Sequence, residues 1–122
     1  MIKVYSTDID ATGAAGAATG NKDVQMHTPG RLLAVAIDYV SAPATTVVTV
    51  STPGLPGVAN VVAPAGNTDR VLYPRVAVQT AAGADIAGRA EEPPLVSGRV
   101  NIALSAANSG TGVVRVRLFI ES

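Results

Sequence analysis

The single histidine of the sequence, His27, is the first residue to consider for acid–base or nucleophilic chemistry. Hydrolysis by a serine nucleophile needs a histidine base and a carboxylate that orients this base. The candidates for this carboxylate are Asp8, Asp10, Asp23 and Asp38. However, it contains no G-x-S-x-G turn to expose a serine, and His27 lies in a polar run that ends at Pro29-Gly30. We therefore predict a solvent-exposed loop histidine and no catalytic residues.

The acidic residues suggest two other kinds of site, a metal site and a pair of catalytic carboxylates. Asp8, Asp10 and Asp23 have the oxygen ligands that calcium prefers, but they lack the spacing of a calcium-binding loop and its closing glutamate. Glu91 and Glu92 are adjacent, and neighbours on an extended chain point to opposite faces, so they cannot flank one glycosidic bond. The sequence predicts no metal ion and no other cofactor.

Thiol chemistry and phosphate binding lack the necessary residues. The chain has no cysteine, which excludes a disulfide framework, a cysteine-ligated zinc ion and a thiol nucleophile. Gly13, Gly16 and Gly20 form a glycine-rich stretch, but their spacing matches neither of the common phosphate-loop motifs. We predict a flexible connector there, and we expect that the protein is not an enzyme.

The charge and hydropathy of the chain exclude two classes of partner. Nine basic and nine acidic side chains give a net charge of zero, whereas nucleic-acid binding needs a basic face. The longest apolar run, Leu32 to Ile37, is far shorter than the roughly 20 residues of a membrane span. The first residues include no apolar leader segment. We expect a protein that is made in the cytoplasm and binds neither nucleic acid nor a membrane.

Alternation of apolar and polar residues with a period of two dominates the chain from residue 31 onward. Such alternation is typical of strands with one buried face, and runs of proline and glycine separate the alternating segments. We predict an all-β protein, an antiparallel β-sandwich or jelly roll with about eight strands, at residues 2–5, 31–40, 45–52, 58–63, 70–80, 95–97, 99–106 and 113–121. The expected core residues are Leu33, Val35, Ile37, Val76, Val78, Ile102, Leu104, Val116, Leu118 and Ile120.

Residues 1–29 differ in composition from the rest and allow two interpretations. Residues 11–20 contain only alanine, glycine and threonine, which bury too little apolar surface to offset the entropy of ordering. In one interpretation, residues 1–29 are a flexible arm ahead of a β-sandwich domain at 30–122, and the strand at its tip pairs with another sheet edge. In the other, this strand is the first strand of the protein's own sandwich and a long loop follows it.

Two groups of residues are predicted to bind a partner: the strand Ile2, Lys3, Val4 and Tyr5, and the arginines Arg115 and Arg117. Seven of the nine basic residues are arginine, whose planar guanidinium group binds carboxylates at interfaces. The alternative for the arginines is an ordinary solvent-exposed face of the sandwich, on which both side chains would lie together.

Four segments resemble small virion structural proteins of tailed bacteriophages. They are GRLLAVAIDYVSAPATTVVTVST (residues 30–52), NTDRVLYPRVAV (67–78), PPLVSGRVNIALSAA (93–107) and VVRVRLFIE (113–121). The resemblance implies a virion component. From its size and β-rich character we infer a head decoration, or cement, protein, because such phage proteins are commonly small β-rich domains that bind capsids as trimers. Its expected partners are the major capsid protein and further copies of itself in a homotrimer, on the capsid surface.

A second function from a different class is a tail or fibre-associated module that binds host-surface glycan. A β-sandwich suits this function, but glycan sites usually stack sugars on exposed aromatic side chains, and the chain has no tryptophan. A third interpretation is a soluble β-sandwich with an unrelated scaffolding role, which differs from the first only in its partner.

Overall fold

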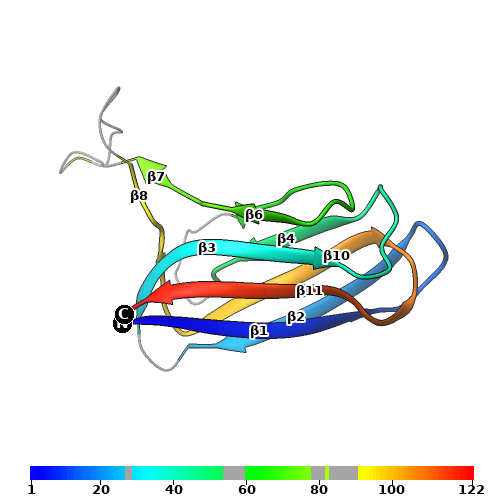
Figure 1. Cartoon of the computed structure of the whole chain (residues 1–122), viewed down its shortest axis with the longest axis horizontal. Coiled ribbons are helices and arrows are strands. Elements are labelled where there is room, and N and C mark those ends of the chain that lie inside the picture. Colours follow the sequence, from blue (N-terminus) through cyan, green and yellow to red (C-terminus); the bar gives the residue numbers. More distant parts are fainter. Residues whose placement is uncertain (27–28, 54–59, 78–81, 83–90) are drawn as a thin grey trace.

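Every regular element in the part of the chain that the structure describes is a β-strand (Figure 1). The structure is a computed structural model, and it describes residues 1–26, 29–53, 60–77, 82 and 91–122. None of these residues belongs to a helix that could cross a membrane. The predicted all-β class is therefore confirmed.

The strands form two antiparallel sheets and one separate strand pair. The first sheet has the order β1 (Ile2–Ala11), β11 (Gly110–Glu121), β3 (Gly30–Tyr39) and β6 (Arg70–Leu72), and β9 (Leu95–Val96) also pairs with β3. The second sheet has the order β2 (Ala18–Gln25), β10 (Arg99–Ala107), β4 (Val47–Ser51) and β5 (Asn60–Val62). Beyond both sheets, β7 (Val76–Ala77) pairs only with β8 (Glu91–Glu92).

The pairing of the strands in the two sheets is nested, apart from the short β9. β1 pairs with β11, β2 with β10, β3 with β6 and β4 with β5, so the first strand meets the last and the middle strands meet each other. Two further ladders, between β11 and β3 and between β10 and β4, join these pairs into sheets. Most ladders thus connect residues that are far apart in the sequence.

One hydrophobic core joins the two sheets. Every second residue of the long strands faces this core, where branched aliphatic side chains predominate. Burial of each such side chain stabilises the fold by about 1.5–3 kcal/mol before entropy is counted. The largest fully buried side chains are Ile9, Leu32, Val35, Ile37, Val48, Val50, Val96, Val100, Ile102, Val113, Leu118 and Ile120.

Most of the predicted core is confirmed. The buried members are Val35, Ile37, Ile102, Leu104, Val116, Leu118 and Ile120. The prediction for Leu33 is wrong, because a register shift opposite Phe119 and Ile120 places Leu32 in the core instead. Val76 lies in the separate β7–β8 pair and is 45% exposed, and Val78 is outside the described residues.

Of the two interpretations of residues 1–29, the structure contradicts the flexible arm and supports a first strand of the protein's own sheets, although a second strand and not a long loop follows it. Residues 2–11 and 18–25 are strands β1 and β2, which pair with β11 and β10 of the two sheets. Ile9, Ala11 and Ala18 enter the core, so these strands do bury apolar surface. Only residues 12–17 form a connection, which the paired residues Thr12 and Thr19 close.

Each of the eight predicted strand segments contains a strand, with two differences in detail. The segment 70–80 contains two short strands, β6 and β7, and its residues 78–80 are outside the described residues, as are 58–59 of the segment 58–63. Strands β2 and β8 were not predicted, because their residues are polar and show no alternation.

Gly20 on β2 lies in close contact with the backbone of β1. A methyl group on Gly20 would collide with the carbonyl oxygen of Asp10 and lie 3.2 Å from the Ile9 Cγ2 atom. We expect Gly20→Ala to lower the free energy of unfolding by about 1–3 kcal/mol, measured by urea denaturation. Thr19→Ala, at an exposed neighbour, is the control and should change stability by less than about 0.5 kcal/mol. Equal stability of the two variants would contradict this account of the packing.

Candidate functional site

The six residues predicted to bind a partner lie on two neighbouring strands of the first sheet. Ile2, Lys3, Val4 and Tyr5 belong to β1, and Arg115 and Arg117 belong to β11. In the antiparallel register Val4 is opposite Phe119, and Ser6 is opposite Arg117. The nested topology thus brings together segments from the two ends of the described chain.

Strand geometry divides these six residues between two sides of the sheet. Ile2 and Val4 alternate with Lys3 and Tyr5, so they point away from the core and are 57% and 54% exposed. Tyr5 packs against the core, and Lys3 is exposed on the same side of the sheet. Four of the six residues therefore share one face, which we call the outer face of the first sheet.

Further residues join this outer face from strands that were not predicted to bind a partner. Val71 on β6 and Leu95 on β9 are 50% and 46% exposed, and they pair with Ala36 and Arg31 of β3. Phe119 lies between Val4 and Ala34 in one row across the sheet. The alternation of Phe119 with core residues was visible in the sequence, but the positions of Val71 and Leu95 depend on strand pairing.

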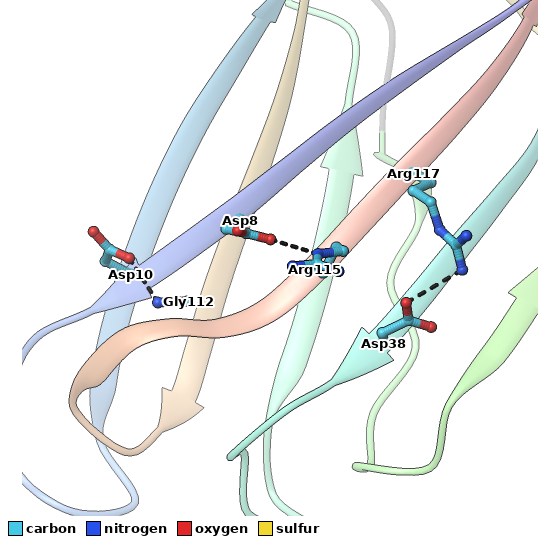
Figure 2. A network of polar contacts seen from close by, with 6 residues as sticks. All are labelled: Asp8, Asp10, Asp38, Gly112, Arg115 and Arg117. Carbon is cyan, nitrogen blue, oxygen red and sulfur yellow. Dashed lines mark hydrogen bonds and ion pairs between the residues drawn. The ribbon is translucent and has the colours of Figure 1, made fainter.

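Two ion pairs cross the outer face beside these apolar residues (Figure 2). Arg115 Nε donates to Asp8 Oδ1 at 2.8 Å, and Arg117 Nη2 donates to Asp38 Oδ2 at 3.2 Å. The hydrogen bond from Arg115 holds the pKa of Asp8 below its ordinary value, and the positive charges of Arg115 and Lys22 add to this effect. The same hydrogen bond raises the pKa of Arg115.

Arg115 and Arg117 lie together on one face, and each already binds a carboxylate of its own chain. Their partners are carboxylates of the same chain, supplied by the strands on either side of β11. All four side chains are partly exposed, and together they carry no net charge. Such a strip is preorganised and neutral, so its burial against a partner costs less than burial of unpaired charges would.

One edge of the first sheet has free backbone groups. Met1 and Ser122 form a hydrogen-bonded pair, with backbone N···O distances of 3.0 and 3.1 Å. In an antiparallel ladder such pairs alternate with pairs whose backbone groups do not bind each other, so this pair decides which residues of β1 bind β11. The backbone groups of the odd-numbered residues of β1 consequently bind β11, and those of Ile2, Val4, Ser6 and Asp8 point away from the sheet. The β1 edge, as we call it, offers these groups to an added strand.

The outer face of the second sheet has a different character. Asn101 Nδ2 donates to Asn21 and to Asp23 Oδ1, the latter at 2.8 Å, and Arg99 lies 3.6 Å from Asp23. Thr49 and Ser51 continue this polar surface on β4. A surface of this kind is well solvated, whereas the first sheet exposes large apolar side chains.

The other candidate residues do not form a chemical site in the described part of the chain. His27 is outside the described residues. Asp10 on the first sheet accepts a hydrogen bond from the Gly112 backbone N–H. Asp23 lies on the second sheet and contacts Arg99 of the same sheet. Glu91 and Glu92 lie exposed on β8, and Glu92 is 3.6 Å from Arg31. Within the described ranges, no group of three histidine or acidic residues could hold a metal ion.

No protein-family model, curated protein or solved structure matches the chain.

The hydrogen bond between Arg115 and Asp8 predicts that the pKa of the Asp8 carboxyl depends on Arg115. In Arg115→Gln we expect the pKa of the Asp8 carboxyl to rise toward its ordinary value of 3.8, as followed by NMR titration. Because the pKa of Asp8 is lower in the folded chain than in the unfolded chain, the contribution to stability is present above about pH 4 and is lost as the pH falls through the lowered pKa. Arg117→Gln, which removes the neighbouring arginine, is the control. An unchanged Asp8 pKa in Arg115→Gln would show that the contact is not formed in solution.

Proposed function

We propose that the protein is a non-enzymatic decoration protein of a bacteriophage capsid, which binds the head surface and stabilises the shell. The partner in this proposal is the major capsid protein, contacted by the outer face of the first sheet. The observation that carries it is the concentration of exposed apolar side chains on this face, beside a neutral ion-paired strip. Exposed apolar patches of this kind are typical of sites that bind other proteins.

The order of the strands supports a β-sandwich of the jelly-roll type. Apart from the short β7, β8 and β9, the strands in chain order pair first with last, second with second-last, and so on toward the middle. The same nesting arises when a long two-stranded ribbon folds over itself, as it does in jelly rolls. Viral capsid domains and lectins both use this architecture. The proposal is thus consistent with a virion protein, and it keeps glycan binding as the second candidate.

The sequence segments that resemble virion proteins coincide with structural elements. They cover β3 and β4, β6 and β7, β9 and β10, and most of β11. These are the strands that carry most of the core and of the outer face of the first sheet. The proposal therefore rests on the resemblance for the class of protein, and on the outer face for the mode of binding.

The proposed mechanism involves no chemical step. A decoration protein that contacts neighbouring capsid subunits adds buried surface that must separate before the shell can rupture. Pressure from packaged DNA then works against this additional surface. Only shape, apolar contact and charge neutrality are required, and the outer face of the first sheet provides the last two.

Co-sedimentation with undecorated mature heads and with unexpanded proheads of the encoding phage tests the proposal. We expect saturable binding to mature heads at a copy number that matches the threefold positions, and weaker binding to proheads. Absence of binding to both particles would refute the decoration function. Binding of host polysaccharide by the same preparation would then establish the glycan-binding alternative.

A pair of matched variants tests which sheet makes the contact. Val71→Lys places a charge on the outer face of the first sheet, and Thr49→Lys places one on the outer face of the second. We expect Val71→Lys to weaken head binding at least about tenfold, because a lysine must be desolvated at the interface. Thr49→Lys should bind like the wild type. The reverse result would assign the contact to the second sheet.

A further inference from the structure

The β7–β8 pair projects from the two sheets and has no strand neighbour in either of them. We call residues 73–77 and 91–94 the projecting segment. It leaves the first sheet after β6, and Figure 1 shows β7 and β8 beyond the β6 edge, on the side opposite β1. Isolated two-stranded pairs are only marginally stable in water. The projecting segment also exposes Tyr73 (67%) and Val76 (45%), which suits it to a contact with another surface.

The base of the projecting segment is fixed to β3. Arg75 Nη1 donates to the carbonyl oxygen of Leu33 at 3.1 Å, at the register shift of that strand. Where the chain returns from β8 toward the first sheet, the Leu32 backbone N–H donates to the carbonyl oxygen of Pro94 at 2.9 Å. Arg31 Nη1 donates to the carbonyl oxygen of Pro93 at 3.2 Å. These contacts orient the segment before it meets any partner, which lowers the entropy lost on binding.

The β1 edge at the other side of the same sheet has the complementary properties. Its free backbone groups belong to Ile2, Val4, Ser6 and Asp8, and neither a proline nor a register shift interrupts β1 before Ile9. The two lysines of the chain, Lys3 and Lys22, lie on β1 and on its neighbour β2. Lys22 belongs to β2, which follows β1 in the chain and is joined to its end by the pairing of Thr12 with Thr19.

The charges of β8 and of the β1 edge, and the positions of both in the molecule, favour the projecting segment of a second copy as the strand that binds the β1 edge. β8 consists of Glu91 and Glu92, both exposed, whereas the β1 edge carries Lys3. Antiparallel pairing of β1 with β1 of another copy, centred on Tyr5, would instead place Lys3 opposite Thr7 and give it no acidic partner on that strand. In addition, β11 and β3 separate β6 from β1. The described projecting segment therefore points away from the β1 edge of its own molecule.

We propose that the projecting segment of one copy adds as a strand to the β1 edge of a second copy. The contact is head-to-tail, because the two surfaces are different and lie at opposite edges of the sheet. Repetition of such a contact gives a ring when the rotation closes and an open chain when it does not. This inference specifies the self-association within the proposed function and rests on it. It leaves the outer face of the first sheet free for the capsid.

Light scattering of the full-length protein over a range of concentrations tests this self-association without capsids. We expect masses that are multiples of 12.2 kDa and increase with concentration. Val4→Pro removes a backbone N–H that points away from the sheet, so it blocks strand addition while leaving the ladder to β11 intact. It should weaken association about tenfold or more, whereas Val4→Thr, which retains the N–H, should associate like the wild type.

A charge exchange identifies the segment that binds the edge and does not depend on the folding of the proline variant. Lys3→Glu and Glu91→Lys should each weaken association several-fold, and their combination in one chain should restore it. Three results would overturn the proposal: a wild-type monomer at every concentration, a Glu91→Lys variant that associates normally, or a combined variant that stays dissociated. A monomeric wild type that still binds heads would overturn only this inference. An oligomer that does not bind heads would refute only the decoration function.

Discussion

The two hydrogen-bond ladders of β11, to β1 on one side and to β3 on the other, are the interaction on which the rest of the structure depends. Inward side chains of β11, such as Leu118 and Ile120, are fully buried in the core. Its outward side chains Arg115 and Arg117 bind carboxylates from the strands on either side. The register of the same ladder decides which backbone groups of β1 remain free. A shift of one residue would exchange the core and the exposed face at the same time.

Alternation in the sequence predicted the strands wherever one face is buried and the other is solvated, which is why the core positions from Ile102 to Ile120 are confirmed. It failed at Leu33, because one extra residue in a ladder reverses the inward and outward positions, and no local pattern marks that residue. It also failed at β2, whose polar residues have little tendency to form a strand alone. β2 is a strand because β10 provides its hydrogen-bond partners from the other end of the chain.

The candidate site could be predicted only in part for the same reason. The alternation around Arg115 and Arg117 indicated that both side chains share a face, and the structure places them together with Ile2 and Val4. Their actual partners could not be predicted, since Asp8 and Asp38 reach them through tertiary pairing with β11. The apolar residues Val71 and Leu95 join the same face from short strands whose register depends on β3. Composition and spacing thus identify candidate residues, whereas the pairing of strands far apart in the sequence decides which of these residues are in contact.

The edges of the two sheets differ in how far they are protected against an added strand. Proteins commonly protect sheet edges with very short strands or with charged side chains. β5 and β6 are short, and β2 carries Asn21, Lys22 and Asp23 in succession. β1 is longer than β5 and β6, and it exposes Ile2 and Val4 beside backbone groups that point away from the sheet, with Lys3 as the charged side chain between them. Such an edge is open to an added strand, which is the premise of the proposed self-association. In the described part of the chain, the β7–β8 pair is the element that belongs to neither of the two larger sheets.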